Sequence, residues 1–341
     1  MAGQTMDIDF FLMRLDKSLP LVAAKWNVYV LPVITVLCLI STIILTILFK
    51  RQKDYIGVQK LVSCIMVITT LCLAVRIPLG IKFLGDDALY TDYLEYKWCE
   101  IFARVNVDTP AAMNIIIGLL KVGLAVQGLI MMFLPKKEKT LMTSRKTVWF
   151  CLLTCVAGVC LYIPSMQLFN FIAIDWVSKL DENVERECCI PFPSDVVINT
   201  EYYQRDVYLG LFMTTHAFPL LTMLTVGIIL SIRLYFMKRV SQSDTVETYQ
   251  HKEVIRAISV CMFGYCVLSL PGLIALLFSL LVYAQVDLGW SFDEINAIIS
   301  YINMADTFFM SILPPVTLLI FCLCDTRFRI IFMHFIGRRR N

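Results

Sequence analysis

The chain has 341 residues, of which 58% are hydrophobic and 17% are charged, and its formal net charge is +3. This composition is typical of a polytopic membrane protein with short loops, and it argues against a separate soluble domain.

Residues 1–25 form the first segment of the chain. They contain Asp7, Asp9 and Asp16 and lack a continuous apolar core. This pattern is not that of a cleavable signal peptide. We therefore expect an extracellular N-terminal segment and a first helix that acts as its own insertion signal.

Seven apolar stretches follow, and each is long enough to cross a bilayer as a helix, which takes about 20 residues. They span residues 26–49, 61–84, 101–134, 147–169, 207–232, 257–286 and 297–324. Runs of this length are too long for barrel strands, so only helices can satisfy their backbone groups in lipid. The sequence predicts an all-α membrane protein, with a seven-transmembrane helix bundle over residues 26–324.

The connecting segments alternate in charge. Those after the first, third, fifth and seventh stretches contain 19 basic and six acidic residues, whereas the N-terminus and the other loops contain seven basic and 19 acidic ones. Because basic segments stay in the cytoplasm, the N-terminus is expected outside and the C-terminus inside, in the plasma membrane. The acidic outer side would attract a cationic ligand.

Residues 325–341 follow the last stretch. Four apolar side chains there have helical spacing and are flanked by arginines: Phe328, Ile331, Phe332 and Phe335. This pattern predicts a short amphipathic eighth helix on the membrane surface, with a basic tail that contacts lipid headgroups.

Three cysteines fall in segments expected outside the membrane, namely Cys99, Cys188 and Cys189. Extracellular cysteines are in an oxidising compartment, so we expect one disulfide from Cys99 to one of the adjacent pair. The sequence leaves open which of the two is bonded.

Ionisable residues inside membrane helices are rare and indicate functional positions. Lys121 is expected near the bilayer midplane, while Arg76 and Asp306 are expected at similar depths in the second and seventh helices. Arg76 and Asp306 are therefore candidates for an ion pair. All three are candidate ligand-binding residues, and a snorkelling lysine or a purely structural pair are the alternatives.

Two further residues complete the candidate ligand site. Asp108, near the outer end of the third helix, is a candidate anchor for a ligand amine or guanidinium, or else a solvated carboxylate. His216, one turn before Pro219, is either a pocket residue or a structural histidine.

Several positions give the chain a resemblance to the rhodopsin-like G-protein-coupled receptors, and more loosely to their invertebrate FMRFamide-receptor-like branch. Pro219 and Pro271 lie where that family has its helix-kinking prolines, and residues 309–329 resemble its seventh helix turning into a membrane-surface helix. The stretch 122–135, followed by lysines, resembles the end of its third helix. The resemblance implies a cell-surface receptor that signals through a heterotrimeric G protein bound to the basic inner loops.

The chain departs from that family at its activation motifs. The Asp/Glu-Arg-Tyr/Phe triplet reads Gln127, Gly128 and Leu129, the helix-six Trp falls on Ser269, and Asn-Pro-x-x-Tyr runs from Thr317 to Phe321. Gly128 has no side chain with which to engage a G protein.

Three functions therefore stay open. The leading interpretation is a receptor for a peptide or another cationic ligand, and the second is a non-signalling receptor-like protein, either a decoy or a partner in a heteromer. A transporter or channel is the third, although no internal repeat is found. Motifs for enzyme chemistry, cofactors or metal ions are lacking, and the alternation of basic loops with apolar stretches argues against nucleic-acid binding.

Overall fold

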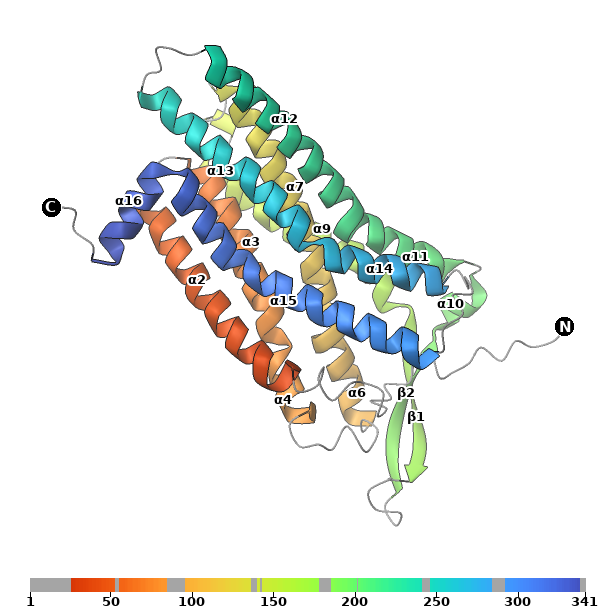
Figure 1. The fold of residues 1–341 in the computed structure, drawn as a ribbon. Helices are drawn as coiled ribbons and strands as arrows, with labels where there is room; N and C mark the ends of the chain where they lie inside the picture. Colours follow the sequence, from red (N-terminus) through yellow and green to blue (C-terminus); the bar gives the residue numbers. More distant parts are fainter. Residues whose placement is uncertain are drawn as a thin grey trace.

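The computed structural model describes residues 26–52, 55–84, 96–135, 140–141, 143–177, 185–200, 202–240, 246–283 and 292–337. Residues 1–25, expected to form the extracellular N-terminus, lie outside this part. Long helices packed side by side make up most of it (Figure 1). The elements, in chain order, are η2 (Trp26–Val30), α2 (Leu31–Arg51), α3 (Ile56–Val75), α4 (Ile77–Leu84), α6 (Tyr96–Ala103), η3 (Arg104–Asp108), α7 (Thr109–Phe133), α9 (Ser144–Met166), β1 (Phe169–Val177), β2 (Glu185–Pro193), α10 (Asp195–Asn199), α11 (Tyr203–Phe212), η4 (Met213–Ala217), α12 (Phe218–Val240), α13 (Val246–Leu268), α14 (Leu270–Tyr283), α15 (Phe292–Cys324) and α16 (Thr326–Phe335).

Six helical segments within the described residues are long and apolar enough to cross a membrane. They are Val28–Arg51, Ile56–Leu79, Tyr96–Phe133, Ser144–Met166, Tyr203–Met237 and Met304–Cys324. Each overlaps one of the stretches predicted from the sequence. The protein is therefore a mostly helical, multi-pass membrane protein.

The sixth predicted stretch, 257–286, does not form one long apolar helix. It is divided between α13 and α14, which are separated at Ser269, two residues before Pro271. Proline removes a backbone donor and clashes with the preceding turn, so it breaks the helix here. The 14 residues of α14 span about 21 Å, less than the roughly 30 Å of a hydrocarbon core, and α13 begins in polar sequence. Neither half alone meets the length and composition of a span.

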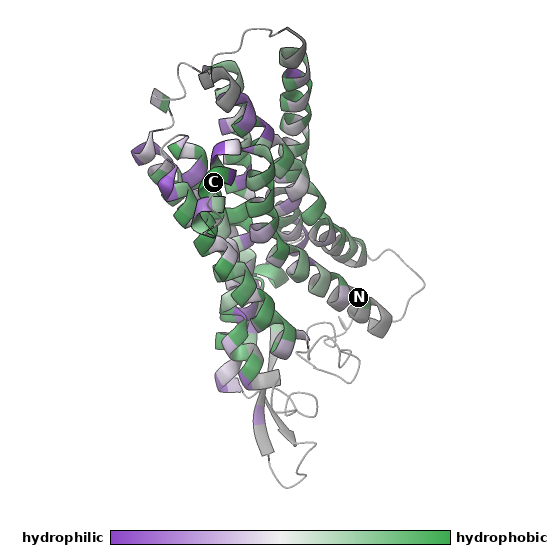
Figure 2. Cartoon of the chain, turned by 60° about the vertical axis from the view of Figure 1, so that its left-hand side comes forward, coloured by the Kyte–Doolittle hydropathy of each residue, from purple (hydrophilic) through white to green (hydrophobic). Residues whose placement is uncertain are grey.

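The helix α7 lies at the centre of the bundle. It packs against α3, α9, α12 and α13. In the most apolar part of the membrane span that contains α7, 67% of the residues are buried, against 44% or less in the corresponding parts of the other five spans. The outer helices expose apolar side chains instead: Val33 and Leu37 of α2 are 60% and 57% exposed, and Leu153 and Val156 of α9 are 65% and 61% exposed. Hydrophobic residues cover the long helices in Figure 2. A surface this apolar is suited to lipid.

A β-hairpin, which the sequence analysis did not predict, follows α9. Its strands β1 and β2 pair antiparallel, from Phe169 opposite Pro193 to Val177 opposite Glu185. The aromatic and β-branched residues of β1 favour a strand. The hairpin packs against α6 and extends from the end of the bundle that carries α4, whereas α16 lies at the other end (Figure 1).

The helix α16 is anchored to the bundle by aromatic contacts. Phe328 is fully buried, and its ring lies 5.3 Å from that of Phe49 and 5.7 Å from that of Phe321. Asp325 caps the helix by accepting hydrogen bonds from the backbone N–H groups of Arg327 and Phe328.

Polar contacts join the neighbouring helices at the same end. The amide of Gln52 donates to Asp325 at 3.0 Å. Glu253 of α13 accepts from the hydroxyl and the backbone N–H of Thr326, at 2.6 Å and 3.2 Å. His251 Nε2 lies 2.8 Å from the backbone oxygen of Met131, at the end of α7. We call the contacts of His251 and Glu253 the α13 latch, because they fasten α13 to α7 and to the start of α16.

Candidate functional site

Four of the five candidate ligand-binding residues come together inside the bundle. Arg76 lies between α3 and α4, Lys121 in α7, His216 in η4 and Asp306 in α15. We call these four residues the charged cluster. They belong to four elements that are far apart in the sequence.

Lys121 is the most buried member, with 6% of its surface exposed. Its ammonium donates a hydrogen bond to Ser269 Oγ at 3.0 Å and lies 5.6 Å from the centre of the Tyr265 ring. It also interacts electrostatically with Asp306 and His216.

Asp306 faces the break between α13 and α14. Its carboxylate interacts with the backbone N–H of Gly272, in the first turn of α14. Backbone N–H groups in the first turn of a helix have no partner within that helix. Asp306 therefore lies beside the first turn of α14, although it belongs to a different helix.

Gly272 permits this approach because it has no side chain. A Cβ atom at this position would lie 2.6 Å from Asp306 Oδ1 and 2.6 Å from His216 Cε1. Both distances are far below van der Waals contact. The glycine thus allows the carboxylate and the imidazole to reach the backbone of α14.

Arg76 contacts the residue next to Asp306. Its Nη1 donates to Thr307 Oγ1 at 3.1 Å, while its Nε is buried with no hydrogen-bond partner. Arg76 and Asp306 interact electrostatically. However, no ion pair of 4.0 Å or less joins them in the described part of the chain. Instead of the predicted ion pair with Asp306, Arg76 forms a hydrogen bond with the adjacent residue Thr307.

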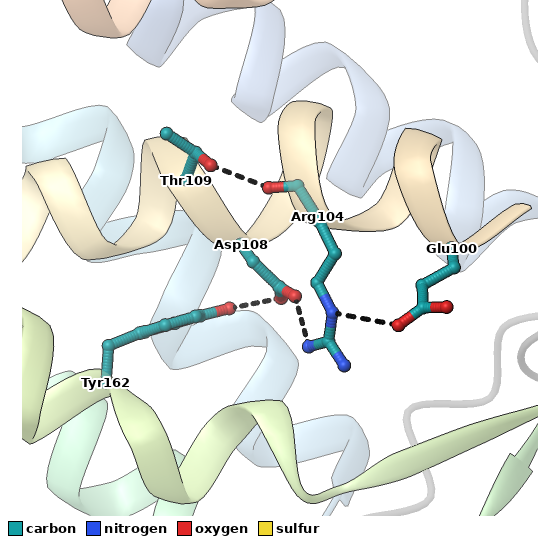
Figure 3. A network of polar contacts seen from close by, with 5 residues as sticks. All are labelled: Glu100, Arg104, Asp108, Thr109 and Tyr162. Carbon is teal, nitrogen blue, oxygen red and sulfur yellow. Dashed lines mark hydrogen bonds and ion pairs between the residues drawn. The ribbon is translucent and has the colours of Figure 1, made fainter. Parts of the chain in front are cut away.

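The fifth candidate, Asp108, belongs to a separate network (Figure 3). Arg104 Nη1 lies 2.8 Å from Asp108 Oδ2, and the Tyr162 hydroxyl donates to Asp108 Oδ1 at 2.8 Å. Arg104 also lies 3.9 Å from Glu100. Both oxygens of Asp108 therefore have partners, and its side chain is 14% exposed. This arrangement favours a structural role for Asp108, because its contact with Tyr162 links η3 to α9.

Two of these residues lie in π-helical segments, Asp108 at the end of η3 and His216 within η4. Such segments are often found at functional sites, because one extra residue per turn redirects side chains. Next to η4, a Cβ atom at Gly118 would lie 3.0 Å from Pro219 Cγ. The kink proline therefore packs closely against the central helix.

The positions of the family's activation motifs are buried in the other half of the bundle. Gln127 is fully buried, and both polar atoms of its amide lack a partner. A Cβ atom at Gly128 would lie 3.0 Å from Leu230 Cδ1 and 3.3 Å from Ile258 Cγ2. Leu129 is partly buried against the same hydrophobic core. A larger side chain at Gly128 has no space in this conformation.

In α15, Thr317 hydrogen-bonds with the Tyr265 hydroxyl at 3.1 Å and donates to the Leu313 carbonyl. Phe321 is 2% exposed, and its ring lies 5.0 Å from that of Phe49. These residues therefore hold α15 against α13 and α2.

The side chains of Cys99, Cys188 and Cys189 lie outside the described part of the structure. The backbone of α6, which contains Cys99, packs against β2, which contains the other two. The disulfide therefore stays a prediction. The described residues contain no group of His, Cys, Asp or Glu that could hold a metal ion.

Three residues that build the site were not predicted from the sequence. Ser269 was noted only as a departure from a family motif, and Gly272 and Thr307 were not noted. The Ser-Leu-Pro-Gly sequence inside an apolar stretch signals a helix break with free backbone groups. It did not show that Lys121 and Asp306 meet that break.

Comparison with known proteins gave no relative for this chain. No protein-family model matches the sequence, and no curated protein matches it significantly.

Proposed function

We propose that the protein is a seven-helix receptor of the cell surface. In this proposal α13 and α14 together form the sixth crossing, which is bent at Ser269 and Pro271. Support comes from their packing, since α13 contacts α7, α12 and α15, and α14 contacts α15.

The charge distribution supports an extracellular N-terminus and a plasma-membrane location. The basic segments after α2, α7, α12 and α15 would all face the cytoplasm. On that side α16 would lie on the membrane surface, with its arginines near anionic lipid headgroups. An epitope tag at residue 2 tests this orientation. Antibody should reach the tag on intact cells, and binding only after permeabilisation would reverse the proposed orientation.

The charged cluster is the observation that carries the receptor proposal. Ionisable side chains from the second, third, fifth and seventh crossings meet at the break in the sixth. Charges are costly inside a membrane and usually mark a functional site. A ligand in contact with this cluster would alter the angle between α13 and α14, and so shift the bundle between two conformations.

The ligand proposed is a peptide or another cationic molecule, because the loops on the outer side are acidic. Fluorescent pools of synthetic basic tetrapeptides, applied to intact cells that express the protein, provide the test. We expect saturable binding to these cells. Binding no greater than on untransfected cells would contradict the proposal.

A second function is a receptor-like protein that does not signal, as a decoy or as a partner in a heteromer. The packing of Gly128 against Leu230 and Ile258 favours it, because the family's G-protein-binding arginine has no counterpart there. Nucleotide exchange on a panel of heterotrimeric G proteins separates the two functions. Exchange driven by a bound peptide supports signalling through the basic inner loops, and binding without exchange supports the decoy or partner.

A further inference from the structure

The charged cluster has more positive than negative charge. Arg76 and Lys121 are both cationic, and Asp306 is the one carboxylate that the described residues place beside them. His216 adds no negative charge in either protonation state. With a neutral histidine, the cluster therefore has a net charge of about +1 inside the bundle.

The cluster also has hydrogen-bond donors to spare. A lysine ammonium has three N–H donors, and the described contacts of Lys121 use one of them, for Ser269. Arg76 Nε is buried without a partner, although Nη1 is bound to Thr307. Buried donors that lack an acceptor are uncommon in native proteins, because leaving them unsatisfied costs free energy.

We propose that the charged cluster binds an anionic group, which neutralises Lys121 and Arg76 and accepts their unused hydrogen bonds. Two sources share this chemistry, a free inorganic anion such as chloride and the carboxylate of a ligand. The second source rests on the proposed receptor function. Since the outer loops are acidic, a ligand that carries a carboxylate to the cluster would also carry positive charge, as a basic peptide with a free carboxyl terminus does.

The first experiment tests the anion site without any ligand. The full-length protein in lipid nanodiscs is unfolded by heat at increasing chloride concentration, with ionic strength held constant by a bulkier sulfonate salt. We expect the unfolding temperature to rise saturably with chloride. Lys121→Met should abolish the dependence, and Asp306→Asn should lower the half-saturating chloride concentration roughly tenfold, because a repelling charge is removed.

Lys60→Met is the matched control, since the Lys60 ammonium contacts Ser144 at the other half of the bundle. This variant should keep the chloride dependence of the unmodified protein. The opposite responses of Lys121→Met and Asp306→Asn separate anion binding from a general loss of stability. The anion site would be overturned if chloride changed the unfolding temperature of neither the unmodified protein nor Asp306→Asn, and if the peptides described below had no effect either.

The second experiment distinguishes the two sources. Pools of basic tetrapeptides with free or amidated carboxyl termini are added at low chloride. Stabilisation by the free-acid pool alone, lost in Lys121→Met, supports a ligand carboxylate. Equal stabilisation by both pools leaves the receptor function intact but overturns the carboxylate source. Stabilisation by chloride and by neither pool supports an inorganic anion and counts against the receptor function.

Discussion

Lys121 donates a hydrogen bond to Ser269, with 3.0 Å between Nζ and Oγ. The contact joins the central helix α7 to the residue at which α13 ends and α14 has not yet begun. A charged side chain is thereby attached to the residue between the two helices of the proposed sixth crossing.

Ser269→Ala should destabilise the protein by about 1.5–3 kcal/mol, the usual value for a hydrogen bond to a charged group. Thermal unfolding of the purified protein measures the effect. Ser41→Ala is the control, because Ser41 bonds only to the carbonyl of Leu37 in its own helix, and this variant should change stability by less than about 0.5 kcal/mol. Equal effects of the two substitutions would contradict a structural role for the Lys121 contact.

Gly272→Ala should cost about 1–3 kcal/mol, because the added methyl group would overlap Asp306 and His216. Gly210→Ala is the matched control in α11, where a Cβ atom meets nothing within 4 Å. The control should be neutral or up to about 1 kcal/mol more stable, since alanine favours helix. If both variants unfold at the temperature of the unmodified protein, the close approach at Gly272 is wrong.

Arg76 and Asp306 should be coupled, but weakly, because their interaction does not include a direct ion pair. Each single change to Ala leaves charge behind in a buried region. The double change should therefore cost about 0.5–1 kcal/mol less than the sum of the single changes. A double-mutant cycle on thermal stability measures the difference, and strictly additive effects would show that the two residues do not interact.

Cys99→Ser should reduce the amount of protein at the cell surface, because loss of an extracellular disulfide typically costs about 2–5 kcal/mol. Cys160→Ser is the control, since Cys160 is a free, exposed cysteine of α9. Mass spectrometry of the unreduced protein should show a peptide that joins Cys99 to Cys188 or Cys189. Normal surface expression of Cys99→Ser, with no bridged peptide, would contradict the bond.

The unmodified chain should catalyse little nucleotide exchange on any G protein, because Gly128 offers only backbone at the position of the family's arginine. Gln127→Glu with Gly128→Arg should raise exchange and lower thermal stability by about 1–3 kcal/mol, since the arginine has to displace Leu230 and Ile258. Basal exchange in a reconstituted assay measures the first effect. Strong exchange by the unmodified chain would show that the missing arginine is not required.

The apolar runs were sufficient to predict most of the long helices, because the length required to cross a bilayer is a strong constraint. Counting residues along each helix also predicted that Arg76 and Asp306 lie at similar depths in the membrane. The direct partners were not predictable, since 1.5 Å of rise per residue fixes height but not rotation about the bundle. The structure shows that Arg76 turns towards Thr307 and Asp306 towards Gly272.

The β-hairpin and the break at Ser269 depended on weaker signals. The segment that forms β1 lies in the connection between the fourth and fifth apolar stretches, for which no strand was predicted. At Ser269, Pro271 indicates a bend, but the local sequence does not show that Asp306 of α15 lies beside the first turn of α14. Neither the pairing of β1 with β2 nor the approach of Asp306 to α14 can be read from the local sequence.

The α13 latch sets how much free energy is needed to move this helix. Moving α13 away from the bundle would break the three hydrogen bonds of the α13 latch, one to Met131 and two to Thr326. At about 0.5–1.5 kcal/mol for the bond to Met131 and about 1.5–3 kcal/mol for each bond to the Glu253 carboxylate, they favour the closed arrangement by about 3.5–7.5 kcal/mol, which corresponds to a population ratio of roughly four hundred to three hundred thousand. A ligand that prefers the open form only tenfold would leave most molecules closed, so full opening requires either a strongly selective ligand or a partner that binds the separated ends of α7 and α13.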